Sequence, residues 1–202
     1  EWDNLFNYGE NNTINFEKLN GVVGVFGKNY SGKSSVIDSA LYTIYNSISK
    51  NNRKNLNIIN QNKQAGCGRV EIDIDGKAYI IERKSEKYKK KLHGEETDEA
   101  KTDVEFSMID PATGEETSLN SLDRNGTDKE IRKIFGTIDD FLLTSMSSQM
   151  GAMTFINEGS TKRKEILAKF LDLDQFEKKF RASKNDSIET RALLKKLEDN
   201  NF

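Results

Sequence analysis

One short segment has the residue types and the spacing that bind a triphosphate. Residues 27–34 read G-K-N-Y-S-G-K-S and match the pattern G-x-x-x-x-G-K-S. Glycines let such a loop wrap closely around an anion, with N–H groups directed inward and the positive end of the following helix facing the same anion. In this pattern Lys33 would reach the β- and γ-phosphates, and the Ser34 hydroxyl would bind Mg²⁺. The predicted nucleotide-binding residues are Gly27, Lys28, Asn29, Tyr30, Ser31, Gly32, Lys33, Ser34 and Ser35.

The residues on either side predict the elements that such a loop needs. The apolar run 21–26 reads as a buried strand. After the loop, residues 35–45 have the spacing of a helix with one apolar face. Strand, loop and helix together favour a nucleotide site over the alternative, which is a surface turn rich in Gly and Ser.

Further along the chain, alternating side chains predict antiparallel strands. Residues 69–75 and 102–109 alternate between apolar and polar, and Asp75-Gly76 is a hairpin turn signal. We expect a β-meander over about residues 69–122. The polar stretch 50–68 indicates a surface loop, and the charged stretch 84–101 has no periodicity.

The C-terminal third is predicted to be helical. A capping box at Thr127 and Glu130 starts a helix that stops at Gly136, and a second short helix covers residues 138–144. Helices also begin at Ser160 and Asp174. The last has the loose apolar spacing of a coiled coil, although an ordinary surface helix is the alternative.

Composition excludes several classes of protein. The 202 residues carry a net charge of −2, so any contact with nucleic acid depends on local patches. The single cysteine, Cys67, fits a reducing compartment and reads as a structural residue; His93, the one histidine, has no companion ligands. No signal peptide or membrane span is visible, so we expect a cytoplasmic protein.

The first residue is not Met and the last stretch is helical and charged, which suggests a fragment.

The motifs that would complete a catalytic site are missing. Residues 123–126 match the D-x-x-G of GTPases, but no N-K-x-D follows. No apolar strand ending in an acidic Mg²⁺ ligand is found, no L-S-G-G signature stretch, and no acceptor site or lid of a kinase. We therefore expect this chain to bind ATP weakly and to hydrolyse it poorly by itself.

These residues together resemble a known family. The chain is similar to the N-terminal half of the ATPase head of SbcC-type DNA repair proteins, in the SMC-like branch of ABC ATPases. Its character is closest to the large subunit of recombination nucleases of tailed phages, which would place it in a bacterial host cytoplasm. The segments that carry the resemblance are residues 4–9 and 14–16, 27–38, 79–83, 148–149, 155–156 and 162–167.

The resemblance implies an α/β fold and a composite site. Residues 1–172 would form the N-terminal lobe of an ABC-type head, with a glutamine-containing loop at about 145–159, and residues 173–202 would start a coiled-coil stalk. The C-terminal half of the head would supply the signature motif and the acidic Mg²⁺ site. In this family two heads sandwich two ATP molecules, and the matching glutamine, Gln149, would contact Mg²⁺ and position the attacking water together with Lys33.

The resemblance also implies partners. ATP-driven closure of the two heads would control double-stranded DNA binding and an SbcD-like metallophosphoesterase nuclease, in double-strand-break repair or recombination. The alternative is an architectural DNA-binding ATPase of the SMC or RecN type without a nuclease. Family members often carry a basic residue at the position of Phe6, so a phosphate contact there is in doubt.

A basic run after the predicted strand 78–83 is a candidate DNA contact. Its lysines could each bind a phosphate and add salt dependence. Acidic residues 95–99 follow closely, so a solvated, neutralised hairpin is the alternative. The candidate residues are Lys87, Lys89, Lys90 and Lys91.

Overall fold

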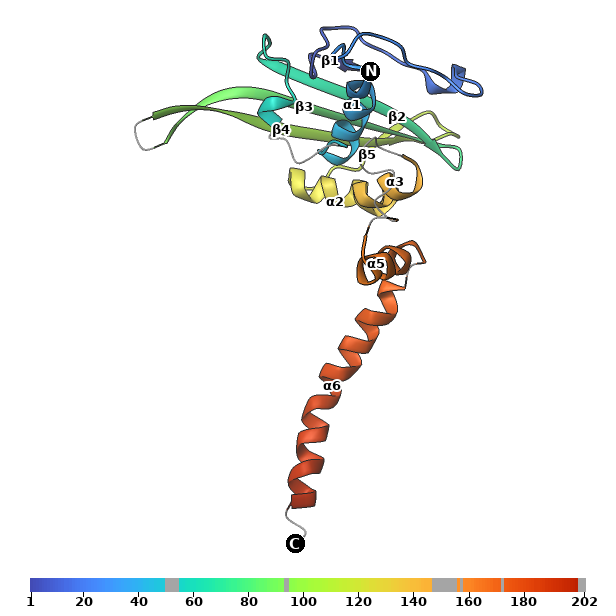
Figure 1. The fold of residues 1–202 in the computed structure, drawn as a ribbon, viewed down its shortest axis with the longest axis vertical. Coiled ribbons are helices and arrows are strands. Elements are labelled where there is room, and N and C mark those ends of the chain that lie inside the picture. Colours follow the sequence, from blue (N-terminus) through green and yellow to red (C-terminus); the bar gives the residue numbers. More distant parts are fainter. Residues whose placement is uncertain (50–54, 93–94, 147–155, 157, 172, 200–202) are drawn as a thin grey trace. The chain divides into compact units, whose positions relative to one another are not determined.

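An antiparallel sheet is the centre of the fold. The computed structural model describes residues 1–49, 55–92, 95–146, 156, 158–171 and 173–199 (Figure 1). The five strands lie in chain order, each paired with the next. They are β1 (Trp2–Asp3), β2 (Ala65–Ile74), β3 (Lys77–Leu92), β4 (Glu95–Ile109) and β5 (Glu116–Ser118). With the helices described below, this confirms the predicted α/β fold and its β-meander.

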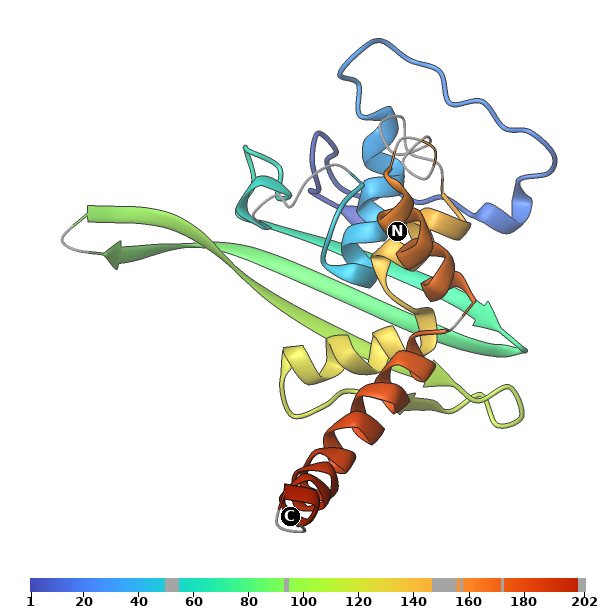
Figure 2. The same cartoon turned by 60° about the horizontal axis from the view of Figure 1, so that its bottom comes forward.

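The meander is longer than the sequence pattern predicts. The turn at Asp75-Gly76 is present, with φ values of 52° and 78°, and Asp73 accepts a hydrogen bond from the Gly76 N–H. However, β2 starts within the predicted surface loop, and β3 and β4 continue through the charged stretch 84–101. Both strands extend past the part of the sheet that the helices cover (Figure 2). Because solvent faces both sides of this hairpin, apolar and polar side chains need not alternate along its strands. The sequence therefore shows no period of two that would predict these strands.

One face of the sheet is covered by two helices, α1 (Lys33–Tyr45) and α2 (Arg124–Phe135). Along β3 the buried side chains of Ile81, Arg83 and Ser85 alternate with the exposed Glu82 and Lys84. Ile81 lies opposite the buried Phe106 of β4. The period of two therefore places the core between this sheet face and the helices.

The caps define where the helices begin. Asp123 accepts a hydrogen bond from the Gly126 N–H at 2.6 Å, so α2 starts before the predicted capping box and ends, as predicted, at Gly136. The helix α3 (Ile138–Thr144) has its own capping box between Thr137 and Asp140. The D-x-x-G match at 123–126 is thus a helix cap.

The segment before the phosphate loop differs from its prediction. The one helical element of residues 13–31 is a 3₁₀ helix, η1 (Phe16–Lys18), and the apolar run 21–26 forms no strand. The side chains of Val22 and Phe26 are 104% and 93% exposed. A buried strand needs neighbours that pair with its backbone, and no described strand lies beside this run.

The chain divides into two compact units, Glu1–Ser145 and Met146–Phe202. The second contains α5 (Ser160–Phe170) and α6 (Asp174–Asp199), which begin at the predicted residues. Apolar side chains of α6 are exposed, among them Phe176, Phe180 and Ile188. The boundary between lobe and coiled-coil stalk at residues 172 and 173 stays a prediction.

Candidate functional site: the phosphate loop at the start of α1

The loop that was expected to hold phosphates is closely folded at its two glycines. Gly32 is the N-cap of α1 and has a φ of 89°, a left-handed conformation that favours glycine. A Cβ atom on Gly27 would lie 2.8 Å from the Ser31 hydroxyl oxygen. A side chain would thus crowd Ser31 at position 27 and would be strained by the left-handed backbone at position 32.

The N-terminus of α1 has no side chain bonded to it. In α2 and α3 the side chains of Asp123 and Thr137 accept hydrogen bonds from the first turn, whereas no side chain caps α1 and its first turn has no acidic residue. The first N–H groups of a helix have no partner within the helix and carry a partial positive charge. These groups in α1 are suited to the oxygens of an anion.

The Lys33 ammonium lies within the loop. Its Nζ donates hydrogen bonds to the carbonyl oxygens of Gly27 at 2.8 Å and Lys28 at 2.6 Å. These bonds hold the charge of the first helical residue beside the loop backbone. Ser34, the predicted Mg²⁺ ligand, lies at the helix start. The N–H groups of the first turn, the Lys33 ammonium and Ser34 therefore lie together at the start of α1, and their binding of phosphates and Mg²⁺ stays a prediction.

Two residues near the N-terminus contact the phosphate loop, and sequence reasoning missed them. The Tyr8 hydroxyl donates to the Gly32 carbonyl at 3.0 Å, and the Asn7 side-chain amide donates to the Tyr30 carbonyl at 3.0 Å. Phe6 is half-buried and packs against a core cluster that includes Leu5. Contacts between segments distant in the chain leave no periodic pattern in the sequence. The one available signal was that Asn7 and Tyr8 lie within residues 4–9, a segment that carries the family resemblance.

Gln149, the predicted Mg²⁺ and water contact, lies outside the described residues, as does His93. Within the described ranges no group of three or more His, Cys, Asp or Glu side chains could hold a metal ion. Cys67 lies in β2, and burial, followed by the nearby Asp3 charge, raises the pKa of its thiol. A raised pKa disfavours the thiolate, in agreement with a structural cysteine.

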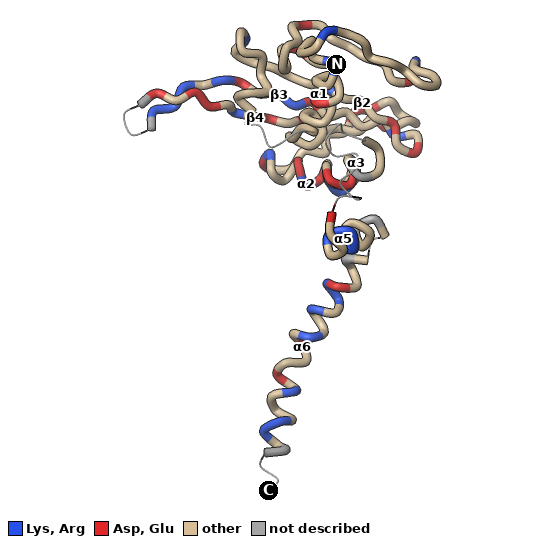
Figure 3. Tube along the Cα trace, in the orientation of Figure 1, with Lys and Arg blue, Asp and Glu red and all other residues tan. Residues whose placement is uncertain are grey.

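The lysines predicted to contact DNA lie on the β3–β4 hairpin, along which basic and acidic residues are interspersed (Figure 3). Lys89 faces Glu96 and Lys90 faces Glu99, each with a nitrogen–oxygen distance of 3.4 Å. Lys87 donates to the backbone carbonyls of Asn60 and Gln61. Lys89 and Lys90 are thus locally balanced by carboxylates and Lys87 is bound to backbone, which is the arrangement that the solvated-hairpin alternative expects.

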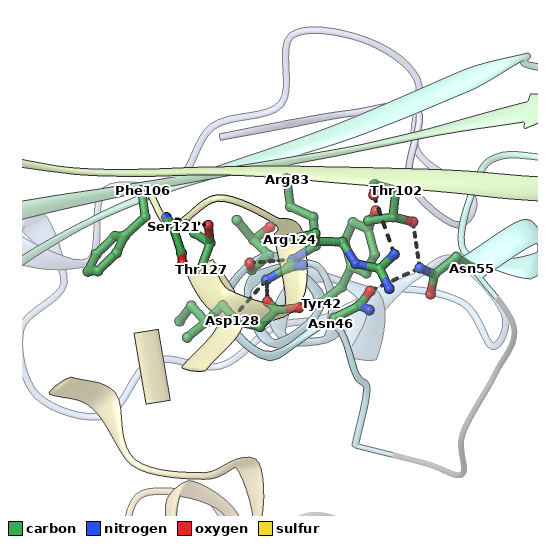
Figure 4. Close-up of polar contacts among 12 residues, drawn as sticks. Tyr42, Asn46, Asn55, Arg83, Thr102, Phe106, Ser121, Arg124, Thr127 and Asp128 are labelled. Atoms are coloured by element: carbon green, nitrogen blue, oxygen red, sulfur yellow. Dashed lines mark hydrogen bonds and ion pairs between the residues drawn. The ribbon is translucent and has the colours of Figure 1, made fainter. Parts of the chain in front are cut away.

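A buried arginine connects the sheet to the helix that follows the loop. Arg83 is 0% exposed and donates from Nε to the Thr43 carbonyl at 2.9 Å and from Nη2 to the Ile44 carbonyl at 3.3 Å (Figure 4). The same Nη2 contacts the Asp128 carboxylate of α2 at 2.6 Å. Sequence reasoning placed Arg83 at the end of a predicted strand, where the basic run begins, and gave it no buried role. Arginine is rarely fully buried.

A second buried polar group lies next to Arg83 (Figure 4). The hydroxyls of Tyr42, Ser85 and Thr102 form a chain of hydrogen bonds that ends at the Asn55 amide. Burial raises the pKa of the Tyr42 phenol, and the Ser85 hydrogen bond opposes this in part. The neutral phenol thus persists and joins α1 to the sheet.

Comparison with known proteins gives matches along almost the whole chain. A family model described as an AAA domain matches residues 2–201. An uncharacterized protein of Acanthamoeba polyphaga mimivirus is 31% identical over 98% of the chain. The C subunit of the nuclease SbcCD from Clostridium acetobutylicum is 27% identical over 81%, and the DNA double-strand break repair Rad50 ATPase of Methanocaldococcus jannaschii is 24% identical over 87%.

The chain spans only 14–15% of the length of these three relatives. In the described part of the chain, no helix is both long and apolar enough to cross a membrane.

Proposed function

This chain belongs to the AAA domain family, as the N-terminal region of an SbcC/SMC-like ATPase, and we propose that its loop 27–35 binds the phosphates of ATP. The observation that carries the proposal is the Lys33 ammonium, held at the loop by two carbonyl oxygens beside the N-terminus of α1. A triphosphate would accept hydrogen bonds from that ammonium and from the first N–H groups of the helix.

The chain's own residues fit ATP with Mg²⁺. The loop backbone can approach phosphate oxygens closely at Gly27 and Gly32, because neither residue has a side chain. The Ser34 hydroxyl would be a Mg²⁺ ligand, and Gln149 would be a second ligand that also positions water. Bound Mg²⁺ would neutralise charge on the transferred phosphoryl group.

We further propose that this region forms one half of a head. The exposed apolar side chains of Val22, Val25 and Phe26 support this, because a run of this kind is normally covered. The C-terminal half of the same head would cover it and supply the signature motif and the acidic Mg²⁺ site. Two such heads would close around two ATP molecules, and this chain alone would then have little ATPase activity.

DNA repair is the process that the relatives' names support. One relative is named as part of the nuclease SbcCD, and Rad50 is named as a double-strand break repair ATPase. We propose that head closure here controls double-stranded DNA binding and an SbcD-like nuclease partner, in the cytoplasm. Contacts of Lys87, Lys89, Lys90 and Lys91 with DNA remain part of this proposal, although DNA would have to compete with Glu96 and Glu99. An architectural SMC- or RecN-like ATPase remains the alternative.

The test of the nucleotide site is Lys33→Ala in the full-length protein. Losing charge-assisted hydrogen bonds should raise the Kd for Mg·ATP by about 10- to 100-fold. Titration with a fluorescent ATP analogue measures this. Lys133→Ala is the matched control, because Lys133 makes an exposed ion pair with Glu130 on α2. Equal Kd values for Lys33→Ala and the unsubstituted protein would reject the site.

A further inference from the structure

The segment Asn4–Gly9 is a compact loop with an unusual backbone. Asn4 and Phe6 both have a φ of 53°, and the loop is closed by hydrogen bonds from Asn4 N–H to the Gly9 carbonyl and from Tyr8 N–H to the Leu5 carbonyl. Left-handed backbone at a bulky residue such as Phe6 is rare, and it persists only where surrounding contacts enforce it.

Those enforcing contacts come from the segment around η2 (Asn55–Asn57). Phe6 N–H donates to the Ile58 carbonyl at 2.7 Å, and Asn60 N–H donates to the Asn4 carbonyl at 2.8 Å. The Asn60 side-chain amide donates to the Tyr8 carbonyl at 2.9 Å. Hydrogen bonds at Asn4, Phe6 and Tyr8 therefore hold this loop against residues 58–60.

The Tyr8 ring is fixed as well. It meets the buried Trp2 ring edge to face, with 5.2 Å between ring centroids and an interplanar angle of 89°. The ring also lies close to the phosphate loop, since a Cβ atom on Gly32 would lie 3.1 Å from it. With its position set by these contacts, the Tyr8 hydroxyl reaches the Gly32 carbonyl at 3.0 Å.

The direction of the Gly32 carbonyl decides where the first helical N–H points. In a trans peptide the C=O and the following N–H point in opposite directions. Holding the Gly32 oxygen on Tyr8 therefore directs the Lys33 N–H away from Tyr8. Ser35 N–H also donates to this oxygen, at 2.9 Å, so both of its lone pairs have donors.

We propose that Tyr8 is a positioning residue for phosphate binding, assisted by Asn7. The Tyr8 hydroxyl holds the Gly32–Lys33 peptide, and the Asn7 amide holds the Tyr30 carbonyl in the same loop. Neither side chain needs to touch the nucleotide. They prepare the loop before binding, so that phosphates meet N–H groups that are already aligned. This inference rests on the proposed nucleotide site.

Tyr8→Phe in the full-length protein is the central test, because it removes one hydroxyl and keeps the ring contacts. The loss of one hydrogen bond should raise the Kd for Mg·ATP about 2- to 12-fold. Tyr45→Phe is the matched control: the Tyr45 hydroxyl donates to the Phe135 carbonyl at 3.2 Å, at the other end of α1. Tyr45→Phe should leave the Kd unchanged.

A second variant separates positioning from a general loss of structure. Incorporation of para-aminophenylalanine at position 8 restores an N–H donor at the same place and should restore the Kd. A raised Kd in Tyr8→Phe with recovery in the amino variant, and an unchanged Tm without nucleotide, would support the proposal. A raised Kd without recovery would overturn it.

The Lys33→Ala variant separates failure of the proposed nucleotide site from failure of the positioning role of Tyr8. If Lys33→Ala loses ATP binding while Tyr8→Phe binds as tightly as the unsubstituted protein, the positioning role is wrong and the nucleotide site stands. If Lys33→Ala also binds normally, the site and the positioning role are both rejected.

Discussion

At the scale of single residues, the phosphate loop contains a bulky side chain on left-handed backbone. Tyr30 has a φ of 64°, and its side chain is 97% exposed. Such backbone costs a residue with a Cβ roughly 1–2 kcal/mol, and an exposed ring recovers none of it by burial. The contact that the structure uses at this position is the Tyr30 carbonyl, which Asn7 binds. The Tyr30 side chain could therefore be removed, and its backbone strain with it, without losing the hydrogen bond from Asn7.

Tyr30→Gly should stabilise the protein. Glycine removes the cost of left-handed backbone and keeps the carbonyl that Asn7 binds, while its greater freedom in the unfolded chain offsets part of the gain. We expect the free energy of unfolding to rise by roughly 0.5–1 kcal/mol, measured by urea denaturation. Tyr88→Gly, on the paired hairpin strand, is the contrasting control and should destabilise. A loss of stability in Tyr30→Gly would show that the ring has packing partners.

The sequence pattern identifies the residues of the proposed phosphate loop, but not the residues that hold the loop in place. Gly27, Gly32 and Lys33 are found from local spacing alone, because the backbone must bend at fixed positions. Tyr8 and Arg83 act through contacts with segments distant in the chain, and their residue types are common on surfaces. Such roles depend on tertiary distances, which no local pattern encodes.

At the scale of elements, Arg83 joins three of them. Its guanidinium extends from β3, binds the last-turn carbonyls of α1 and pairs with Asp128 of α2. The carbonyls at a helix C-terminus have no partners within the helix and carry partial negative charge, so a buried cation is stabilised there. The helix that presents the phosphate loop is thereby fixed to the sheet at its far end.

Asp128→Ala should strongly destabilise the fold. It leaves a buried charge without its carboxylate, and among the described residues Nη1 of Arg83 already lacks a hydrogen-bond partner. We expect a loss of about 3–5 kcal/mol in the free energy of unfolding, measured by urea denaturation. Asp103→Ala is the matched control, because Asp103 pairs with Lys101 at 3.0 Å on the surface, and should cost no more than about 1 kcal/mol. Similar losses in both variants would contradict a special role for the buried pair.

Local patterns predict an element when its own residues determine it. The β-meander, its Asp75-Gly76 turn, and the starts of α5 and α6 follow from alternation, turn chemistry and caps. The outer half of the β3–β4 hairpin was missed because it is held by backbone pairing between strands with solvent on both faces. Residues 21–26 were predicted to be a strand from their apolar character alone, which indicates burial but does not supply a neighbour.

At the scale of the whole molecule, those same residues indicate that the first unit has an uncovered surface. Val22, Val25 and Phe26 are 104%, 60% and 93% exposed, next to the loop that would bind phosphates. The chain spans 14% of the SbcCD relative that it matches. The C-terminal half of the proposed head would bury this apolar run. The same contact would bring the missing catalytic groups next to the loop that would bind the nucleotide.

Phe26→Ala should therefore have different consequences in two contexts. In the 202-residue chain the ring is almost fully exposed, so its loss should change the free energy of unfolding by less than about 0.5 kcal/mol. In the full-length protein the ring would be buried by the C-terminal half of the head, and its loss should cost about 3–5 kcal/mol. Urea denaturation of both chains measures the difference, with Leu122→Ala as the control, because Leu122 is 107% exposed and lies away from the loop in sequence. A small effect in both contexts would mean that the apolar run stays uncovered in the complete protein, and the half-head proposal would lose its structural support.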